Sequence, residues 1–155
     1  MSWQAARRHV VTAPHVTLKA PGPLSAAQQR ACREAAERFG PFELELGGPQ
    51  TFGERVISLR AGGEAVSRLH AALVAAVGDP PGEFELGGYH PHLTLALAYR
   101  PLLGGWADAL ASARAEFADL DAQPLRFAVQ AVALFYKDKP GQPYEVVERW
   151  MLEGG

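Results

Sequence analysis

The stretches His15-Val16-Thr17-Leu18 and His92-Leu93-Thr94-Leu95 follow one pattern, in which a histidine, an apolar residue, a threonine and a second apolar residue succeed one another. Alternation of polar and apolar residues is typical of a β-strand with one buried face. In such a strand the histidine and the threonine share a face, roughly 6.5–7 Å apart. The chain has only four threonines, and two of them stand two places after a histidine. Each stretch is therefore expected to present one imidazole and one hydroxyl side by side.

The two stretches belong to an internal repeat. They lie 77 positions apart (92 − 15), and the sequence after the first stretch returns in the second half at an offset of 83 (124 − 41). At that offset the apolar positions coincide, because Phe42, Leu44, Leu46 and Phe52 align with Leu125, Phe127, Val129 and Phe135. Each half is therefore expected to contain a strand with a histidine, a helix and two further strands.

Periodicity and turn residues predict the other elements. Ser25 followed by Gln28 indicates a helix that begins with a capping box, and Gly47-Gly48-Pro49 indicates a turn. Phe127 and Phe135 are expected to pack in the core. Strands are expected at residues 15–19, 42–46, 56–59, 92–99, 125–136 and 144–152, and helices at 25–39, 66–77 and 103–117. We expect one α+β domain over residues 1–155, with two interlocked lobes, antiparallel-type sheets facing a central cleft, and helices outside.

Composition excludes several classes of protein. With 48% hydrophobic and 21% charged residues in 155, the chain is neither disordered nor collagen-like. Its single cysteine, Cys32, rules out an intrachain disulfide and an all-cysteine metal site. A net charge of −2 argues against a protein that coats nucleic acid. The apolar runs fall short of the roughly 20 residues that span a membrane, and the N-terminus lacks the features of a signal peptide, so a cytoplasmic location and no membrane partner are expected.

The paired motifs indicate phosphoester chemistry. If a pseudo-two-fold axis relates the halves, His15, Thr17, His92 and Thr94 converge on one cleft. Cleaving a cyclic phosphate needs a base for the nucleophile and an acid for the departing oxygen, and imidazoles serve in both roles near neutral pH. Threonine hydroxyls donate to phosphate oxygens and stabilise developing charge. One such motif alone is more often structural, but two at equivalent repeat positions favour a functional pair.

The sequence resembles the 2H phosphoesterases, also called 2′-5′ RNA ligase-like or LigT-like proteins, whose signature is two His-apolar-Thr/Ser-apolar motifs about eighty residues apart. Residues 13–19 (APHVTLK) and 89–96 (YHPHLTLA) look like these motifs, including the proline before each histidine. Residues 53–59 and 141–147 look like the strands that follow them. The resemblance covers about residues 10–152 and implies a bilobal α+β fold.

The resemblance also implies an activity. Members hydrolyse or transesterify cyclic or 2′-5′ phosphodiesters of RNA ends or small nucleotides without a cofactor. By analogy His15 is assigned as the acid and His92 as the base, with Thr17 and Thr94 binding phosphate. His90-Pro91-His92 is no metal pair on this interpretation, because no carboxylate or cysteine cluster accompanies it. The expected partners are therefore RNA termini or small cyclic nucleotides, with neither metal nor cofactor.

The chain departs from the family before the first motif. Members usually have a further strand and helix there, whereas 14 residues precede His15. We expect residues 1–9 to be the end of that helix, with translation starting upstream in the natural gene. The alternative is a second copy of the chain that covers the shorter lobe, giving a dimer in place of a monomer.

Further residues are weaker candidates for substrate contacts. Basic side chains just past the motifs or on the neighbouring strands could reach phosphates, and tyrosines could stack on a base. The candidates are Lys19, Arg55, Tyr89, Arg100, Arg126 and Tyr136.

Three functions remain open on the sequence. They are a phosphodiesterase, an RNA- or nucleotide-binding module without turnover, and a reversible 2′-5′ RNA ligase. Both motifs are intact in all four positions, and binding alone would not require two imidazoles, so an enzyme is favoured.

Overall fold

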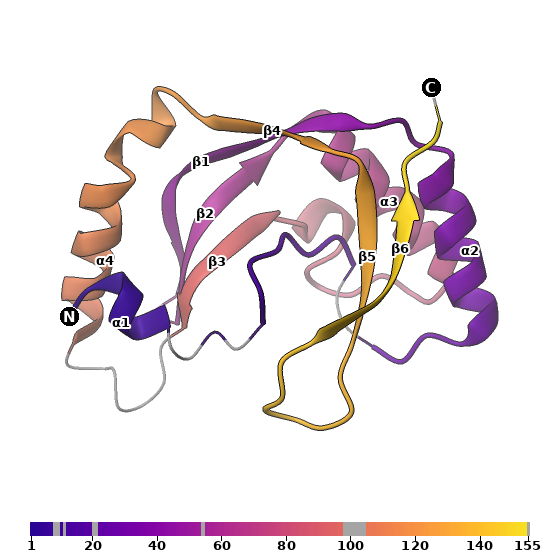
Figure 1. The fold of residues 1–155 in the computed structure, drawn as a ribbon, viewed down its shortest axis with the longest axis horizontal. Coiled ribbons are helices and arrows are strands. Elements are labelled where there is room, and N and C mark those ends of the chain that lie inside the picture. The colour runs from indigo at the N-terminus through magenta and orange to yellow at the C-terminus, as the bar shows by residue number, and fades with distance from the viewer. Residues whose placement is uncertain (8–9, 11, 20–21, 54, 98–104, 155) are drawn as a thin grey trace.

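Helices and strands are interspersed along the chain, which ends in three successive strands. The computed structural model describes residues 1–155 except 8–9, 11, 20–21, 54, 98–104 and 155 (Figure 1). The helices are α1 (Trp3–Arg7), α2 (Ala26–Glu37), α3 (Glu64–Val77) and α4 (Trp106–Glu116), with short 3-10 turns η1 (Leu86–Gly88) and η3 (Ala118–Asp121). The strands are β1 (Phe42–Phe52), β2 (Val56–Gly62), β3 (His92–Leu97), β4 (Leu125–Val129), β5 (Ala131–Tyr136) and β6 (Glu145–Met151).

The strands form two antiparallel sheets, each with its own helices. The first sheet has the order β3-β2-β1-β4 and the second pairs β5 with β6. One apolar core joins the first sheet to α1 and α4, and a second core joins β5 and β6 to α2 and α3. Figure 1 shows the two helix pairs at opposite ends of the molecule with the sheets between them. The fold is therefore α+β with two lobes, as the sequence predicts.

The repeat is visible where the halves meet. β1 pairs with β4, and Leu44 lies directly opposite Phe127. These two residues are 83 positions apart (127 − 44), which is the offset at which the sequence repeats. A residue that pairs with its own repeat equivalent lies on a two-fold axis, so this pair marks the pseudo-symmetry axis of the fold.

The start of α2 is determined locally, as expected. The Ser25 side chain accepts a hydrogen bond from the backbone N–H of Gln28, and the Gln28 side chain accepts one from the backbone N–H of Ser25. These reciprocal bonds satisfy two groups that the first helical turn would otherwise leave unpaired.

The strand expected at residues 15–19 does not form. This segment makes a single antiparallel bridge, between Val16 and Leu93 of β3. The carbonyl oxygens of Thr17 and Leu18 accept hydrogen bonds from side chains instead of from a neighbouring strand. The alternating pattern is present, but no strand of the described structure extends the pairing beyond Val16.

The turn expected at Gly47-Gly48-Pro49 is also wrong, because β1 continues through it with a shift in register between Leu46 and Pro49. The chain reverses at Gly53 instead, whose φ is 56°. Gly48 donates its N–H to Asp121 Oδ1 at 3.0 Å, and a Cβ on Gly48 would lie 2.8 Å from that carboxylate. The glycine therefore allows close approach of the backbone to Asp121 rather than a turn.

The long strand expected at 125–136 is divided at Gln130. Its first part, β4, belongs to the four-stranded sheet, and its second part, β5, to the other sheet. The Gln130 carbonyl accepts a hydrogen bond from the backbone N–H of Leu152 at 2.9 Å, which holds the bend. Phe127 is 43% exposed because β4 is an edge strand, so its expected core position is wrong. Of the strand expected at 92–99, residues 98–99 lie outside the described part.

Candidate active site

The bridge between Val16 and Leu93 brings the two motifs together. Continued by one residue on each side, the antiparallel register of this bridge sets His15 opposite Thr94 and Thr17 opposite His92, although only Val16 and Leu93 are paired. Val16 and Leu93 point into the core, so the four polar side chains lie on the opposite face. The two histidines are diagonal neighbours at this register, for which a separation of about 7–8 Å is typical.

In each motif, the histidine side chain is hydrogen-bonded to the backbone carbonyl two residues before it. Nδ1 of His15 lies 2.7 Å from the carbonyl oxygen of Ala13, and Nδ1 of His92 lies 2.8 Å from that of His90. A carbonyl can only accept, so each Nδ1 carries a proton, and Nε2 is the atom left for chemistry. The proline between each carbonyl and its histidine restricts the backbone, which explains why the two geometries agree.

Each imidazole also contacts a phenylalanine from the other half of the chain. His15 packs against Phe135 of β5 with ring centroids 5.3 Å apart, and His92 packs against Phe52 of β1 at 4.6 Å. The two phenylalanines are repeat equivalents (135 − 52 = 83). Phe135, expected in the core, is half-buried beside His15.

The strand next to β3 adds a third hydroxyl. Ser58 of β2 pairs with Thr94 and therefore shares its face of the sheet. The Ser58 side chain is fully buried, and its Oγ has no hydrogen-bond partner among the described residues. Arg60 pairs with His92 in the same register, but its guanidinium binds Asp121.

An apolar cavity of about 720 Å³ opens beside the first motif. His15 and Thr17 line it, together with Phe135 of β5 and Tyr144, which precedes β6. Its volume lies within the range of small-molecule pockets in proteins. The described lining also includes Val16, Leu18, Phe42, Val129 and Leu134.

The structure separates the weaker candidates. Lys19 forms an ion pair with Glu85 at 3.0 Å, and Arg126 forms one with Glu45 at 2.9 Å, so both charges are already compensated. Tyr89 stacks on His70 with centroids 3.7 Å apart, which occupies one face of its ring.

The remaining candidates are exposed or undescribed. Arg55 is exposed in the turn between β1 and β2. Tyr136 is 56% exposed and lies beside Asp138, whose hydrogen bond and charge raise the pKa of the phenol. Arg100 lies outside the described residues.

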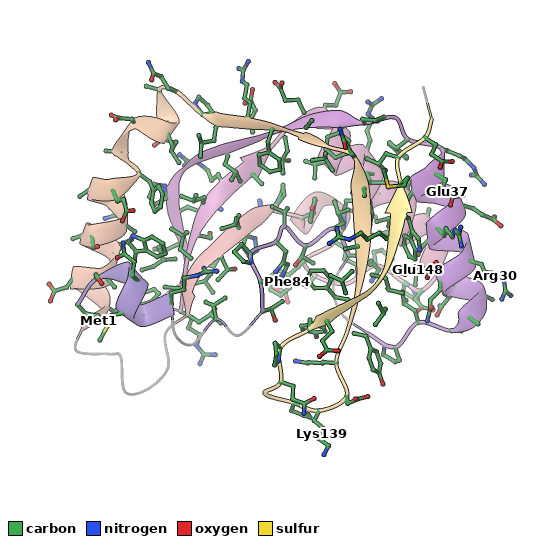
Figure 2. All side chains as sticks on the ribbon, viewed as in Figure 1. Met1, Arg30, Glu37, Phe84, Lys139 and Glu148 are labelled. Carbon is green, nitrogen blue, oxygen red and sulfur yellow. The ribbon has the colours of Figure 1, made fainter. Side chains whose placement is uncertain are left out.

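Sequence reasoning missed Phe52, Ser58 and Phe135 as neighbours of the motifs. Phe52 and Phe135 carry a signal in hindsight, because they align in the repeat, Phe52 as the last residue of β1 and Phe135 as the last but one of β5. Ser58 carries none, since only the register of β2 against β3 places it beside Thr94. Nothing in the sequence indicated that the side chain of Phe84, near the centre of the view in Figure 2, is 73% exposed.

Two further observations concern the described residues alone. The described residues contain no group of three or more histidine, cysteine, aspartate or glutamate side chains placed to hold a metal ion. None of the helices described is both long enough and apolar enough to cross a membrane.

Comparison with known proteins identifies the family. The profile of the 2′-5′ RNA ligase superfamily matches residues 3–141, which include both motifs. The chain belongs to the 2′-5′ RNA ligase superfamily. No curated protein matches the chain significantly.

Solved structures support the same superfamily fold. Escherichia coli LigT, solved in complex with 3′-AMP, is 22% identical with a TM-score of 0.60, over 98% of this chain and 84% of LigT. The protein TT0787 of Thermus thermophilus is 23% identical with a TM-score of 0.57, over 91% of this chain and 79% of its own. A protein described as a phosphoesterase is 22% identical with a TM-score of 0.58, over 90% and 76%. At these identities the likeness establishes the fold of this superfamily member.

Proposed function

We propose that the protein is a metal-independent phosphodiesterase that hydrolyses cyclic or 2′-5′ phosphodiesters of RNA ends or small nucleotides. The observation that carries the proposal is the matched pair of Nδ1 contacts, from His15 to Ala13 and from His92 to His90. They orient both imidazoles in the same way, and neither Nε2 has a hydrogen-bond partner among the described residues. An acid and a base on opposite sides of a phosphate need this arrangement.

In the proposed reaction His92 begins neutral and His15 begins protonated. Nε2 of His92 takes a proton from water as the water oxygen bonds to phosphorus. The bond between phosphorus and the ribose oxygen breaks, and Nε2 of His15 gives its proton to that oxygen. The products are a phosphomonoester and a free hydroxyl, and exchange of one proton with solvent restores both histidines.

The threonines would stabilise the phosphate in this scheme. Continuing the register of the Val16–Leu93 bridge by one residue on each side would set Thr17 opposite His92 and Thr94 opposite His15, so that each hydroxyl would have an imidazole on either side. Hydroxyl donors there would face the non-bridging oxygens, where negative charge grows in the transition state.

A small or terminal substrate fits the surroundings best. The net charge is −2, which disfavours a protein that binds long RNA along its phosphates, and both Lys19 and Arg126 are paired with carboxylates. The cavity lined by His15 and Thr17 is of a size that takes a nucleotide-scale ligand, although His92 and Thr94 are not among the described residues that line it. The bound 3′-AMP in the LigT structure supports the same class of ligand. The expected location of such an enzyme is the cytoplasm.

The test uses the purified protein with a panel of 2′,3′-cyclic nucleotides and 2′-5′ dinucleotides. Alanine at His15 or at His92 should each remove nearly all turnover, and the double variant should be little worse than either single one. Alanine at Thr17 or Thr94 should cost on the order of 10²-fold in kcat. A His92→Ala protein with more than a tenth of the wild-type rate would contradict the assignment. Joining of RNA ends without hydrolysis would favour the ligase, and binding without turnover would favour the binding module.

A further inference from the structure

The two motifs share a further feature, which involves their backbone and not their histidine or threonine side chains. In each motif, backbone carbonyl oxygens are hydrogen-bonded to side chains from other parts of the chain. Arg7 of α1 donates from Nη1 to the carbonyl oxygens of Thr94 and Leu95, at 3.2 Å each. On the first motif, the Tyr89 hydroxyl donates to the Thr17 carbonyl at 2.8 Å, and Nδ1 of His70 binds the Leu18 carbonyl. The acceptors are repeat equivalents, since Thr17 and Thr94, and likewise Leu18 and Leu95, are 77 positions apart.

The local backbone explains why these carbonyls need partners. In β3 the register passes from Thr94, opposite Ser58, to Ala96, opposite Ile57. Leu95 is thus the extra residue of a bulge, which interrupts the ladder of hydrogen bonds. The first motif has only the bridge at Val16 and forms no regular strand. Side-chain donors therefore replace strand pairing in both motifs.

The donors on the first motif are themselves firmly held. His70 is buried, and its Nε2 accepts a hydrogen bond from the N–H of Leu86 at 2.9 Å. Because Nδ1 donates and Nε2 accepts, these contacts fit one neutral tautomer. Leu86 has a φ of 53°, a conformation that costs a non-glycine residue free energy, so the bond to His70 holds a strained loop.

Tyr89 links the two motifs directly. Its ring stacks on His70 at 3.7 Å with an interplanar angle of 9°, and it lies three residues before His92. Burial raises the pKa of its phenol to about 12, so the hydroxyl remains a donor throughout the range in which an enzyme works. The chain that leads into the second motif therefore holds the backbone of the first.

We propose that Arg7 on one motif, and Tyr89 with His70 on the other, are positioning residues that fix the backbone of each His-Thr pair. The proposal rests on the proposed function and names residues that act through Thr17, Thr94 and their histidines. Displacement of a reacting group by about 1 Å can cost a large factor in rate. We call Arg7 the clamp of the second motif, and Tyr89 with His70 the clamp of the first. Loss of either clamp should therefore lower kcat without unfolding the protein.

The first test compares Tyr89→Phe and Arg7→Met with Arg30→Met, a control on the outer side of α2 (Figure 2). Phenylalanine keeps the ring that stacks on His70 and removes only the hydroxyl. Each clamp variant should lose about tenfold in kcat with a smaller change in KM, at a Tm close to that of the control. Unchanged kcat in both variants would overturn the proposal, as would a loss that merely follows a fall in Tm.

The second test asks which threonine each clamp serves. Tyr89→Phe should cost less in a Thr17→Ala background than in a Thr94→Ala background, and Arg7→Met should show the reverse, because coupled residues are not additive. Equal costs in both backgrounds would refute a motif-specific role.

A third measurement separates this proposal from the proposed function. The carbonyl ¹³C resonance of Thr17 should move in Tyr89→Phe and that of Thr94 in Arg7→Met, each without the other. Unmoved resonances would overturn the clamps even in an active enzyme. An inactive wild type with these shifts would instead count against the proposed function alone.

Discussion

Phe135 lies edge-on to His15, with ring centroids 5.3 Å apart and an interplanar angle of 61°. The contact restricts rotation of the imidazole and covers one side of it with apolar surface. The hydrogen bond from Nδ1 to Ala13 leaves the ring one further freedom, a tilt about that bond, and the phenyl ring opposes it. Phe52 does the same for His92.

Replacing either phenylalanine with leucine should therefore lower kcat about tenfold, because the imidazole loses its fixed orientation. Phe135→Leu and Phe52→Leu should have similar effects, given their equivalent places. Phe39→Leu is the matched control, since Phe39 packs on the core that joins β5 and β6 to α2 and α3. It should lower the Tm and leave kcat unchanged. A full wild-type rate in both site variants would show that the rings do not orient the histidines.

The two histidines should be distinguishable by leaving group. A p-nitrophenyl phosphodiester needs little protonation of its departing oxygen, so the variant that lacks the acid should recover much of its rate on it. We expect recovery for His15→Ala and none for His92→Ala. Recovery of the other variant would reverse the roles, and recovery of neither would contradict a division into acid and base.

The wild type should also show a bell-shaped dependence of kcat/KM on pH when it acts on a natural cyclic phosphate. Because one histidine must be protonated and the other neutral, the rate should fall on both sides of neutrality.

Ser58→Ala should leave the Tm unchanged or raise it. The hydroxyl is fully buried without a partner among the described residues, and such a group costs free energy that alanine does not. Thermal unfolding of the variant tests this, with Ser25→Ala as the contrasting change. Ser25→Ala removes the capping bond at α2 and should destabilise by about 1 kcal/mol. A Ser58→Ala protein that is the less stable of the two would mean that the hydroxyl is bonded in solution.

Acid should weaken the contact at Asp121. The hydrogen bond from Arg60, together with that from the Gly48 N–H, holds the pKa of Asp121 below its ordinary value. A carboxyl whose pKa is lowered by folding stabilises the protein above the unfolded pKa, and this contribution disappears as the pH falls through the folded pKa. Asp121→Asn should thus lower the Tm at pH 7 slightly and at about pH 3 less. A difference that does not depend on pH would show that the charge of Asp121 contributes nothing.

The sequence predicted the parts of the fold that depend on neighbouring residues. The capping box at Ser25 is local, and the sequence after the first motif repeats at an offset of 83 that the pairing of Leu44 with Phe127 reproduces. The turn predicted at Gly47-Gly48-Pro49 is wrong because Gly48 serves another purpose. Its lack of a side chain lets the backbone approach Asp121, which lies 73 residues further along the chain. No local pattern reports that contact.

The candidate site was predictable in its polar side chains and not in their surroundings. Alternation placed His15 with Thr17 and His92 with Thr94 on shared faces, yet it could not show that residues 15–19 lack a neighbouring strand along most of their length. Contacts from Arg7 and His70 depend on helix packing, so spacing alone could not reveal them.

The crossed contacts of His15 with Phe135 and of His92 with Phe52 have an evolutionary consequence. Each half of the repeat supplies a histidine to one contact and a phenylalanine to the other. One half alone would hold an imidazole without its aromatic support, and a phenylalanine with nothing to support. A half-length ancestor with this arrangement would therefore have needed two copies to build a single site, and gene duplication with fusion would have joined partners that already depended on one another.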